Sequence, residues 1–169
     1  MGSAGPFLFL DCDGVLAGSR VQTATADDPS LLHAPASLGA AGHALQRFDG
    51  GSPSLERRCL AELQLIVRRT GARCVLTTTW RHDAALRSFL VAALEEYEIA
   101  VVGDTIDLSG EGGGRGDEVA AYLAAHAPAA GAVEFVAIDD SDAHVVNFEK
   151  ALPAGRYGDT LCINVDQSR

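Results

Sequence analysis

The chain has 169 residues, of which 47% are hydrophobic and 21% are charged. These values are typical of one globular domain, and they exclude a disordered, collagen-like or coiled-coil chain. The formal net charge of −10 disfavours nucleic acid as a partner unless basic residues gather on one face.

Cysteine usage and hydropathy bear on where the protein works. The four cysteines, Cys12, Cys59, Cys74 and Cys162, show no CxxC spacing. We therefore expect reduced thiols in an intracellular, cytoplasmic protein. No stretch approaches the roughly 18 consecutive apolar residues of a membrane span, so we expect no membrane partner. Nothing in the sequence fixes an oligomeric state.

The first predicted element is a buried strand that ends in carboxylates. Phe7 to Leu10 is a continuous apolar run that leads directly into Asp11, Cys12 and Asp13. Such a run predicts a strand covered on both faces, and open parallel sheets bind ligands beyond the carboxyl ends of their strands. We expect Asp11 and Asp13 at that edge, with Cys12 pointing away from both.

Residues 17–53 are predicted to form an irregular insertion. The stretch is rich in Gly, Ala, Ser, Asp and Pro and has no sustained periodicity. Loops of this length are usually functional flaps or disordered segments, and the sequence leaves both possibilities open.

Helices and strands alternate from residue 54 onward. Helical spacing predicts a first helix that Ser54 caps and Gly71 ends. Its predicted buried face consists of four apolar residues, Leu60, Leu63, Ile66 and Val67. The elements predicted after it are a strand at 72–76, a helix at 86–97, a strand at 99–103, a helix from Arg115 to His126, and strands at 135–138 and 161–165.

This alternation predicts an α/β fold. We expect one Rossmann-like domain over residues 1–169, with an open and mainly parallel sheet, helices on both faces and right-handed crossovers. The insertion at 17–53 and the glycine-rich loop at 104–114 are too short to form a second large domain.

Carboxylates follow two of the predicted strands. Asp11 and Asp13 follow the first strand, and Asp139 and Asp140 follow the strand at 135–138. If these carboxylates meet at one edge, they repel one another unless a cation lies between them. Oxygen ligands that leave room for water and a substrate oxygen suit Mg²⁺. The sequence therefore predicts a magnesium site formed by these four aspartates.

Phosphate is the electrophile that this edge suits. A carboxylate can attack phosphorus and form an acyl phosphate. Thr77, Thr78 and Thr79 offer hydroxyl and backbone donors at the end of the strand at 72–76, and Arg115 is the cation best placed to absorb developing charge. The register of the three threonines stays open at this stage, and we favour Thr78.

These motifs resemble a known superfamily. Asp11-Cys12-Asp13-Gly14-Val15 is similar to the DxDGx(T/V) signature of the haloacid dehalogenase-like (HAD) superfamily, and hydroxyl, basic and acidic motifs follow in the expected order. The runs from Cys74 to Arg81 and from Arg115 to Leu123 resemble the HAD domains associated with "Swiss army knife" RNA repair proteins. The resemblance covers most of residues 7–142 but not the insertion.

The resemblance implies roles for the carboxylates. Asp11 would be the nucleophile and a Mg²⁺ ligand, and Asp13 would be the general acid and then the general base. Asp139 and Asp140 would hold Mg²⁺ directly or through water, and the backbone carbonyl of Asp13 would be a further ligand. The implied activity is a Mg²⁺-dependent phosphatase that works through an aspartyl-phosphate intermediate.

The resemblance also implies how phosphate is held and reached. Thr77 or Thr78 would bind phosphate, and Arg115 would take the place of the usual lysine, which keeps the charge but changes its reach. A capless, open site would admit a phosphorylated small molecule or a macromolecule, such as a phosphoprotein or a nucleic-acid end, although the net charge does not support nucleic acid.

Two other readings place phosphate or metal on the fold without turnover. A catalytically silent HAD scaffold would serve as a binding module. A receiver domain would carry its phosphate on a mid-chain aspartate, where this chain has Thr77 to Thr79. A cysteine phosphatase loop and a P-loop are excluded, because neither Cys12 nor Cys74 has an arginine six residues later and the only lysine is Lys150.

Overall fold

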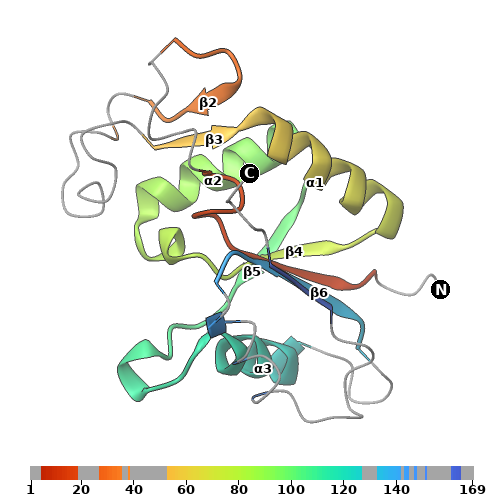
Figure 1. The fold of residues 1–169 in the computed structure, drawn as a ribbon. Coiled ribbons are helices and arrows are strands. Elements are labelled where there is room, and N and C mark those ends of the chain that lie inside the picture. Colours follow the sequence, from red (N-terminus) through yellow and green to blue (C-terminus); the bar gives the residue numbers. More distant parts are fainter. Residues whose placement is uncertain are drawn as a thin grey trace.

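A computed structural model gives the fold (Figure 1). It describes residues 5–18, 27–35, 38, 53–126, 133–141, 143–144, 147 and 151, and the backbone of 161–164. The flap predicted at 17–53 therefore lies largely outside the described residues. No helix within the described part of the chain is long and apolar enough to cross a membrane.

A parallel sheet of five strands forms the centre of the molecule. Its strands are β1 (Phe7–Leu10), β4 (Arg73–Leu76), β5 (Val101–Asp104), β6 (Phe135–Asp139) and β7 (Leu161–Asn164), in the spatial order β5-β4-β1-β6-β7. Counted along the chain, these strands have the order 3-2-1-4-5 of Rossmann-like sheets, whereas receiver domains have 2-1-3-4-5. The predicted α/β fold is confirmed, and the topology excludes the receiver alternative.

Helices cover both faces of this sheet, as predicted. Figure 1 shows α1 (Arg57–Thr70) and α2 (Ala84–Glu96) on one side and α3 (Arg115–His126) on the other. The two cores follow from the alternation of side chains along β1. Leu8 and Leu10 belong to the core beneath α1 and α2, and Phe7 and Phe9 belong to the core beneath α3.

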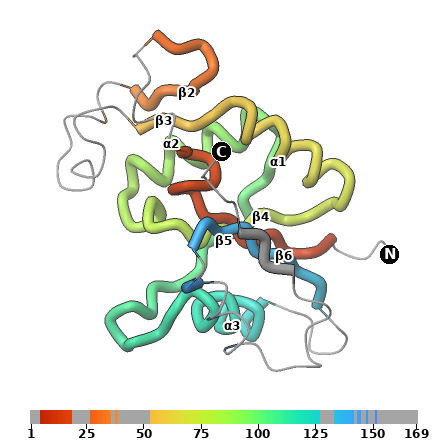
Figure 2. Tube along the Cα trace, in the orientation of Figure 1, coloured from red at the N-terminus to blue at the C-terminus, as the bar shows by residue number. Residues whose placement is uncertain are grey.

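The tube view shows how β1 is placed (Figure 2). β1 runs through the middle of the sheet, between β4 and β6, and the layers of helices lie above and below it. All four of its residues are buried, and each such side chain contributes roughly 1.5–3 kcal/mol to folding. The residues that follow β1 are therefore held at a fixed place, at the carboxyl ends of the strands.

Two local predictions near the insertion were wrong. Leu31–His33 forms β2, inside the stretch predicted to be irregular, and it pairs antiparallel with β3 (Ser54–Glu56). Ser54 therefore lies in a strand, and Glu56 precedes α1 without a capping side chain. Strands of three residues are too short to show periodicity, and this pairing joins distant parts of the chain, so the local sequence carried no signal for it.

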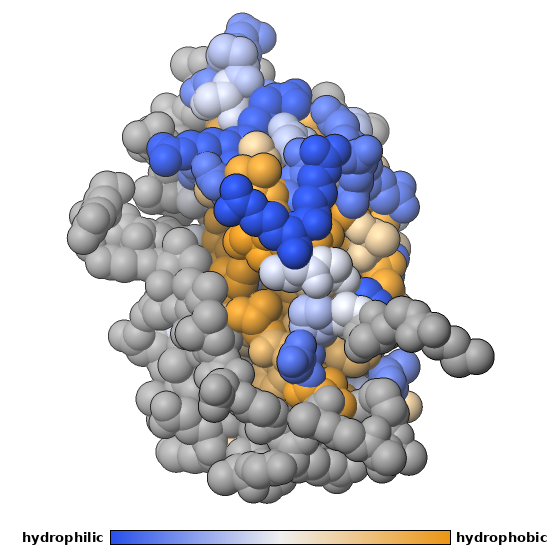
Figure 3. All heavy atoms as spheres, turned by 90° about the vertical axis from the view of Figure 1, so that its right-hand side faces the viewer, coloured by the Kyte–Doolittle hydropathy of each residue, from blue (hydrophilic) through white to orange (hydrophobic). Residues whose placement is uncertain are grey.

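Helix α1 is less deeply buried than its spacing predicted. Leu60 and Leu63 are buried, but Ile66 is 37% exposed and its neighbour Leu65 is 45% exposed. Figure 3 shows hydrophobic side chains gathered in the middle of one side of the molecule, between hydrophilic ones. The end of the helix was predicted correctly: Gly71 adopts a left-handed conformation and its N–H caps the Val67 carbonyl.

Candidate active site

The predicted carboxylates meet where the order of the strands reverses. Asp11 follows β1 and Asp139 ends β6, and these two strands are neighbours. The Asp11 N–H donates to the Ile138 carbonyl at 3.0 Å, which extends the pairing of the strands to the site. Ligands of open α/β sheets bind at such a switch point, beyond the carboxyl ends of the strands.

Three aspartates form a group with the spacing of a cation site. Asp11, Asp139 and Asp140 each offer one carboxylate oxygen, and these oxygens lie within 4.8 Å of one another. Asp11 and Asp139 are buried, whereas Asp140 is exposed. The carboxylate of Asp13, the fourth predicted ligand, is not part of this group.

The pKa values of two of these groups are raised above their ordinary value. Burial is the largest cause that raises the pKa of Asp11, to about 7; nearby Arg115 opposes this, and the Asp139 carboxylate adds to it. The pKa of Asp140 is also raised, first by removal from water and then by Asp139. A bound cation would relieve both effects, and an all-oxygen ligand set fits Mg²⁺.

A tight turn follows Asp11, and the Cys12 side chain points into the core, away from the carboxylates. The Cys12 carbonyl accepts hydrogen bonds from the backbone of Val15, Leu16 and Ala17, and Gly14 adopts a positive φ of 77°. The Cys12 side chain is fully buried in the core beneath α1 and α2. Burial raises the pKa of its thiol well above the usual value, so this cysteine is a packing residue and not a nucleophile.

Asp13 has a partner that the sequence did not predict. The indole Nε1–H of Trp80 donates to its Oδ1 atom at 2.9 Å. Trp80 lies in a 3₁₀ turn, Thr79–His82, and is 3% exposed. The indole therefore cannot stack on a substrate ring from where it lies.

Arg115 lies among the carboxylates, at the first residue of α3. Its Nη2 atom is 3.6 Å from Asp11 Oδ1, and its Nε atom is 3.7 Å from Asp139 Oδ2. The side chain is only 8% exposed, and Nε has no hydrogen-bond partner among the described residues. A buried N–H without an acceptor is uncommon, and it leaves a donor available to a ligand oxygen.

Two further charged residues, Glu118 and Arg81, contact Arg115 and the backbone of Thr77 and Thr78, and sequence reasoning missed both. Glu118 Oε2 is 3.4 Å from Arg115 Nη1 and 2.9 Å from Arg81 Nη2. Arg81 also donates to the backbone carbonyls of Thr77, Thr78 and, at 3.0 Å, Thr105. The side chains of Arg81 and Glu118 are only 4% and 7% exposed, so the two residues form a structural support for the site.

The three threonines face different surroundings. Thr77 follows β4, and its N–H donates to the Leu10 carbonyl, which places it beside Asp11 in the parallel register. Thr78 is fully buried, and its hydroxyl oxygen accepts the Trp80 backbone N–H at 3.3 Å. Thr79 is exposed. The threonine next to Asp11 in the sheet is thus Thr77, not Thr78.

His144 is a further neighbour that the sequence analysis did not identify. Its Nδ1 atom is 2.9 and 3.0 Å from the two carboxylate oxygens of Asp139, and the Ser141 N–H donates to Asp139 Oδ1 at 2.9 Å. The only available signal was a histidine five residues after a strand that ends in carboxylates. Imidazole and backbone donors together orient the Asp139 carboxylate.

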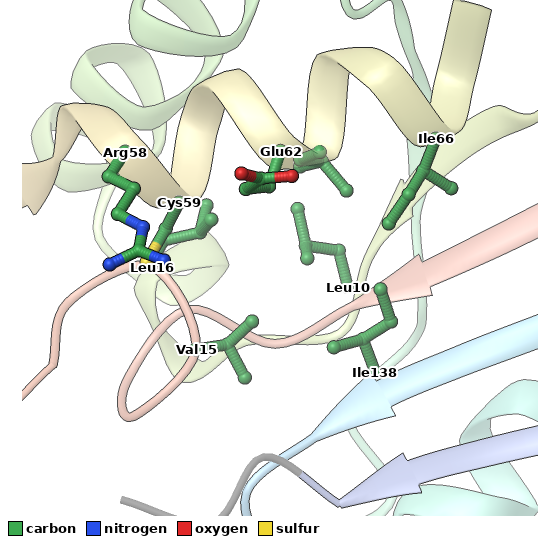
Figure 4. Close-up of a pocket in the computed structure, with 9 residues that line it drawn as sticks. Leu10, Val15, Leu16, Arg58, Cys59, Glu62, Ile66 and Ile138 are labelled. Atoms are coloured by element: carbon green, nitrogen blue, oxygen red, sulfur yellow. The ribbon is translucent and has the colours of Figure 1, made fainter. Parts of the chain in front are cut away.

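An apolar hollow lies on the opposite face of the sheet from Arg115. Its volume is about 180 Å³, and its walls include Leu10, Val15, Leu63 and Ile138. Figure 4 shows side chains of α1 pointing across it toward β1 and β6. Its lining contains none of the aspartates, so the hollow is separate from the carboxylate group.

Of three comparisons with known proteins, one found a match, and it identifies the family. A search of curated proteins found no match. A search of solved structures found none either. The family model described as "HAD domain in Swiss Army Knife RNA repair proteins" matches residues 7–156, and the chain belongs to this family of HAD domains.

Proposed function

We propose that the protein is a Mg²⁺-dependent phosphatase that hydrolyses a phosphomonoester through an aspartyl phosphate on Asp11. The observation that carries the proposal is the meeting of Asp11, Asp139, Asp140 and Arg115 at the switch point of the sheet. Carboxylates alone would repel phosphate. A cation site and a buried guanidinium beside the same aspartate make the edge suitable for a phosphate dianion.

The residues present fit a magnesium ion. The carboxylates of Asp11, Asp139 and Asp140 would hold it, with the backbone carbonyl of Asp13 as a further ligand. When bound, Mg²⁺ would neutralise charge between the phosphate and the aspartates. Burial and the Asp139 carboxylate raise the pKa of Asp11, and a cation bound beside it would favour the ionised carboxylate.

The reaction needs two different aspartates. An Asp11 carboxylate oxygen attacks phosphorus as the bond to the leaving oxygen breaks, and Asp13 gives its proton to that oxygen. A water molecule then attacks the phosphorus of the aspartyl phosphate as the bond between phosphorus and the Asp11 oxygen breaks, and the water gives a proton to Asp13. Inorganic phosphate leaves, and both side chains return to their starting states.

Arg115 and Thr77 are proposed to hold the phosphate. The buried Nε–H of Arg115 has no acceptor among the described residues and lies 3.7 Å from Asp139 Oδ2, while Nη2 of the same guanidinium lies 3.6 Å from Asp11 Oδ1. Thr77 continues β4 next to Asp11 and, by the alternation of side chains, faces the same side of the sheet as Phe9 and α3. Thr78 faces the other way, and its hydroxyl caps the turn that holds Trp80.

An uncapped site suits a macromolecular phosphomonoester as well as a small one. The described residues between β1 and α1 include only the β2 and β3 strands, and those between β5 and α3 include only a short 3₁₀ turn, Ser109–Glu111. The description of the family connects it with RNA repair, which favours a nucleic-acid end, whereas the net charge of −10 favours a phosphoprotein or a small molecule.

The competing proposal is a silent HAD scaffold that binds metal or phosphate without turnover. The observation that favours it is the closeness of Arg115 to an Asp11 that is only 6% exposed. Release of phosphate from p-nitrophenyl phosphate with and without Mg²⁺, compared between wild type and Asp11→Asn, separates the two.

The phosphatase proposal requires that Mg²⁺ stimulates release and that Asp11→Asn abolishes it. Glu96→Gln makes the same carboxylate-to-amide change at the far end of α2, and it should keep full activity. Equal release by wild type and Asp11→Asn, or none by either, would contradict the proposal and leave the scaffold reading.

A further inference from the structure

Asp13 and Trp80 are joined by a hydrogen bond that the proposed mechanism does not require. Trp80 comes from the turn after β4, 67 positions along the chain from Asp13, and its Nε1–H reaches Asp13 Oδ1 at 2.9 Å. The other carboxylate oxygen, Oδ2, accepts no hydrogen bond from the described residues. One oxygen of Asp13 is therefore held and the other is available.

Trp80 itself is fixed from several sides. Its backbone N–H donates to Thr78 Oγ1, and its carbonyl accepts the Asp83 N–H at 3.2 Å. The indole stacks on Phe89 of α2, with ring centroids 6.4 Å apart and planes inclined by 26°. An indole that is 3% exposed and packed in this way has little freedom to turn, so it can hold the oxygen of Asp13 in place.

The chemistry of the indole suits a carboxyl group that gains and loses a proton. The Trp Nε1–H is a donor only, and it does not itself titrate. It can donate to a carboxylate oxygen or to the carbonyl oxygen of a protonated carboxyl group. The bond to Oδ1 can therefore persist through both halves of the reaction, with the proton carried on Oδ2.

We propose that Trp80 is a positioning residue that orients Asp13 for proton transfer to the leaving group. This inference rests on the proposed phosphatase function. The alternative is that the indole is buried for packing and donates to Asp13 only because a buried N–H needs an acceptor. The two readings differ in what they predict for substrates that need a general acid to different extents.

Trp80→Phe is the variant that tests the proposal. It keeps an aromatic ring against Phe89 and removes only the N–H donor. The p-nitrophenolate anion leaves readily without a proton. Phenol, like the tyrosine side chain, keeps its proton up to pH about 10, so the phenolate anion is a poorer leaving group and depends more on a general acid. We expect kcat/KM for phenyl phosphate to fall about ten- to hundredfold more than kcat/KM for p-nitrophenyl phosphate, as loss of a hydrogen bond to a charged group predicts. The comparison uses kcat/KM because this ratio reports the step in which the leaving group departs, whereas hydrolysis of the aspartyl phosphate is common to both substrates.

Phe89→Leu is the matched control. It loosens the packing around Trp80 but leaves the indole N–H donor in place, so the extra loss on phenyl phosphate should be much smaller than in Trp80→Phe. Equal losses on both substrates in Trp80→Phe would overturn the proposal and leave a packing role.

A second measurement does not depend on activity. Trp80 is the only tryptophan in the chain, so the protein has one indole N–H resonance. Asp13→Ala should shift that resonance, and Glu96→Gln should not. An unchanged resonance in Asp13→Ala would overturn the inference without touching the proposed function. A shifted resonance in a protein without any turnover would overturn the proposed function, and with it the catalytic role of Trp80.

Discussion

Arg81 and Glu118 form a buried ion pair, with Arg81 Nη2 2.9 Å from Glu118 Oε2 and both side chains less than 8% exposed. The pair connects the turn after β4 to helix α3 across the edge of the sheet. Thr105 joins it, since its hydroxyl lies 3.3 Å from Glu118 Oε2. Burial lowers the pKa of the Arg81 guanidinium, and the Glu118 carboxylate counters that effect. The site's cation, Arg115, shares the same carboxylate.

Glu118→Gln should therefore destabilise the protein strongly. The change leaves Arg81 and Arg115 buried without their shared counter-ion, and breaking a buried pair in this way costs about 3–5 kcal/mol. Urea denaturation measures the loss. Glu98→Gln is the control, because Glu98 pairs with Arg68 on the surface, with side chains 65% and 59% exposed, and such a pair contributes about 1 kcal/mol or less. Equal losses in the two variants would mean that the buried pair is not a support.

Thr77 and Thr78 should respond differently to valine. Thr77→Val removes the hydroxyl proposed to bind phosphate, so inorganic phosphate should become a weaker competitive inhibitor, by about tenfold for one lost hydrogen bond to a charged group. Thr78→Val removes the cap of the turn at Thr79–His82, which should cost about 1 kcal/mol of stability. Phosphate inhibition should be unchanged in Thr78→Val. If inhibition is weakened in Thr78→Val and unchanged in Thr77→Val, the phosphate contact belongs to Thr78.

The contribution of Arg115 to activity should depend on the shape of its guanidinium as well as on its charge. Its guanidinium reaches Asp11, Asp139 and Glu118 at 3.4 to 3.7 Å, and one ammonium group cannot span all three. We expect Arg115→Met to lower kcat/KM for p-nitrophenyl phosphate by about 10²- to 10³-fold, as loss of a group that stabilises developing charge does. Arg115→Lys should lose only about tenfold. Equal activity in the Met and Lys variants would show that the charge at this position does not contribute.

The sheet could be predicted because its strands carry strong local signals. Phe7 to Leu10 is apolar throughout, as a strand buried on both faces requires, and Asp11 marks where it ends. The same reasoning located Asp139 at the end of β6. Parallel topology then brings these two aspartates together without any further information, which is why the centre of the site could be located from residue types alone.

The supporting contacts could not be predicted, because they join distant parts of the chain. Glu118 looked like an ordinary acidic residue in the first turn of a helix, and only the fold buries it against Arg81. The hydrogen bond from Trp80 to Asp13 depends on how the turn after β4 lies against the turn after β1. His144 contacts Asp139 through a turn whose geometry no periodicity reveals.

The raised pKa of Asp11 makes the stability of the metal-free protein depend on pH. Its pKa rises from an ordinary value of 3.8 to about 7 in the folded protein, mainly through burial. Between these values the folded state binds a proton that the unfolded state has released. The stabilisation is therefore fully present below pH about 4 and is lost as the pH rises through 7, by up to about 4 kcal/mol for this group.

Mg²⁺ should remove this dependence, because a cation that binds only the folded state stabilises it and favours the ionised carboxylate. Urea midpoints measured in EDTA at pH 5.5 and pH 8, and again with Mg²⁺, test the prediction. We expect Mg²⁺ to raise the midpoint more at pH 8 than at pH 5.5. Asp11→Asn, which cannot ionise at this position, should lose less stability between the two pH values in EDTA. The same pH slope in wild type and Asp11→Asn would contradict the assignment of this cost to Asp11.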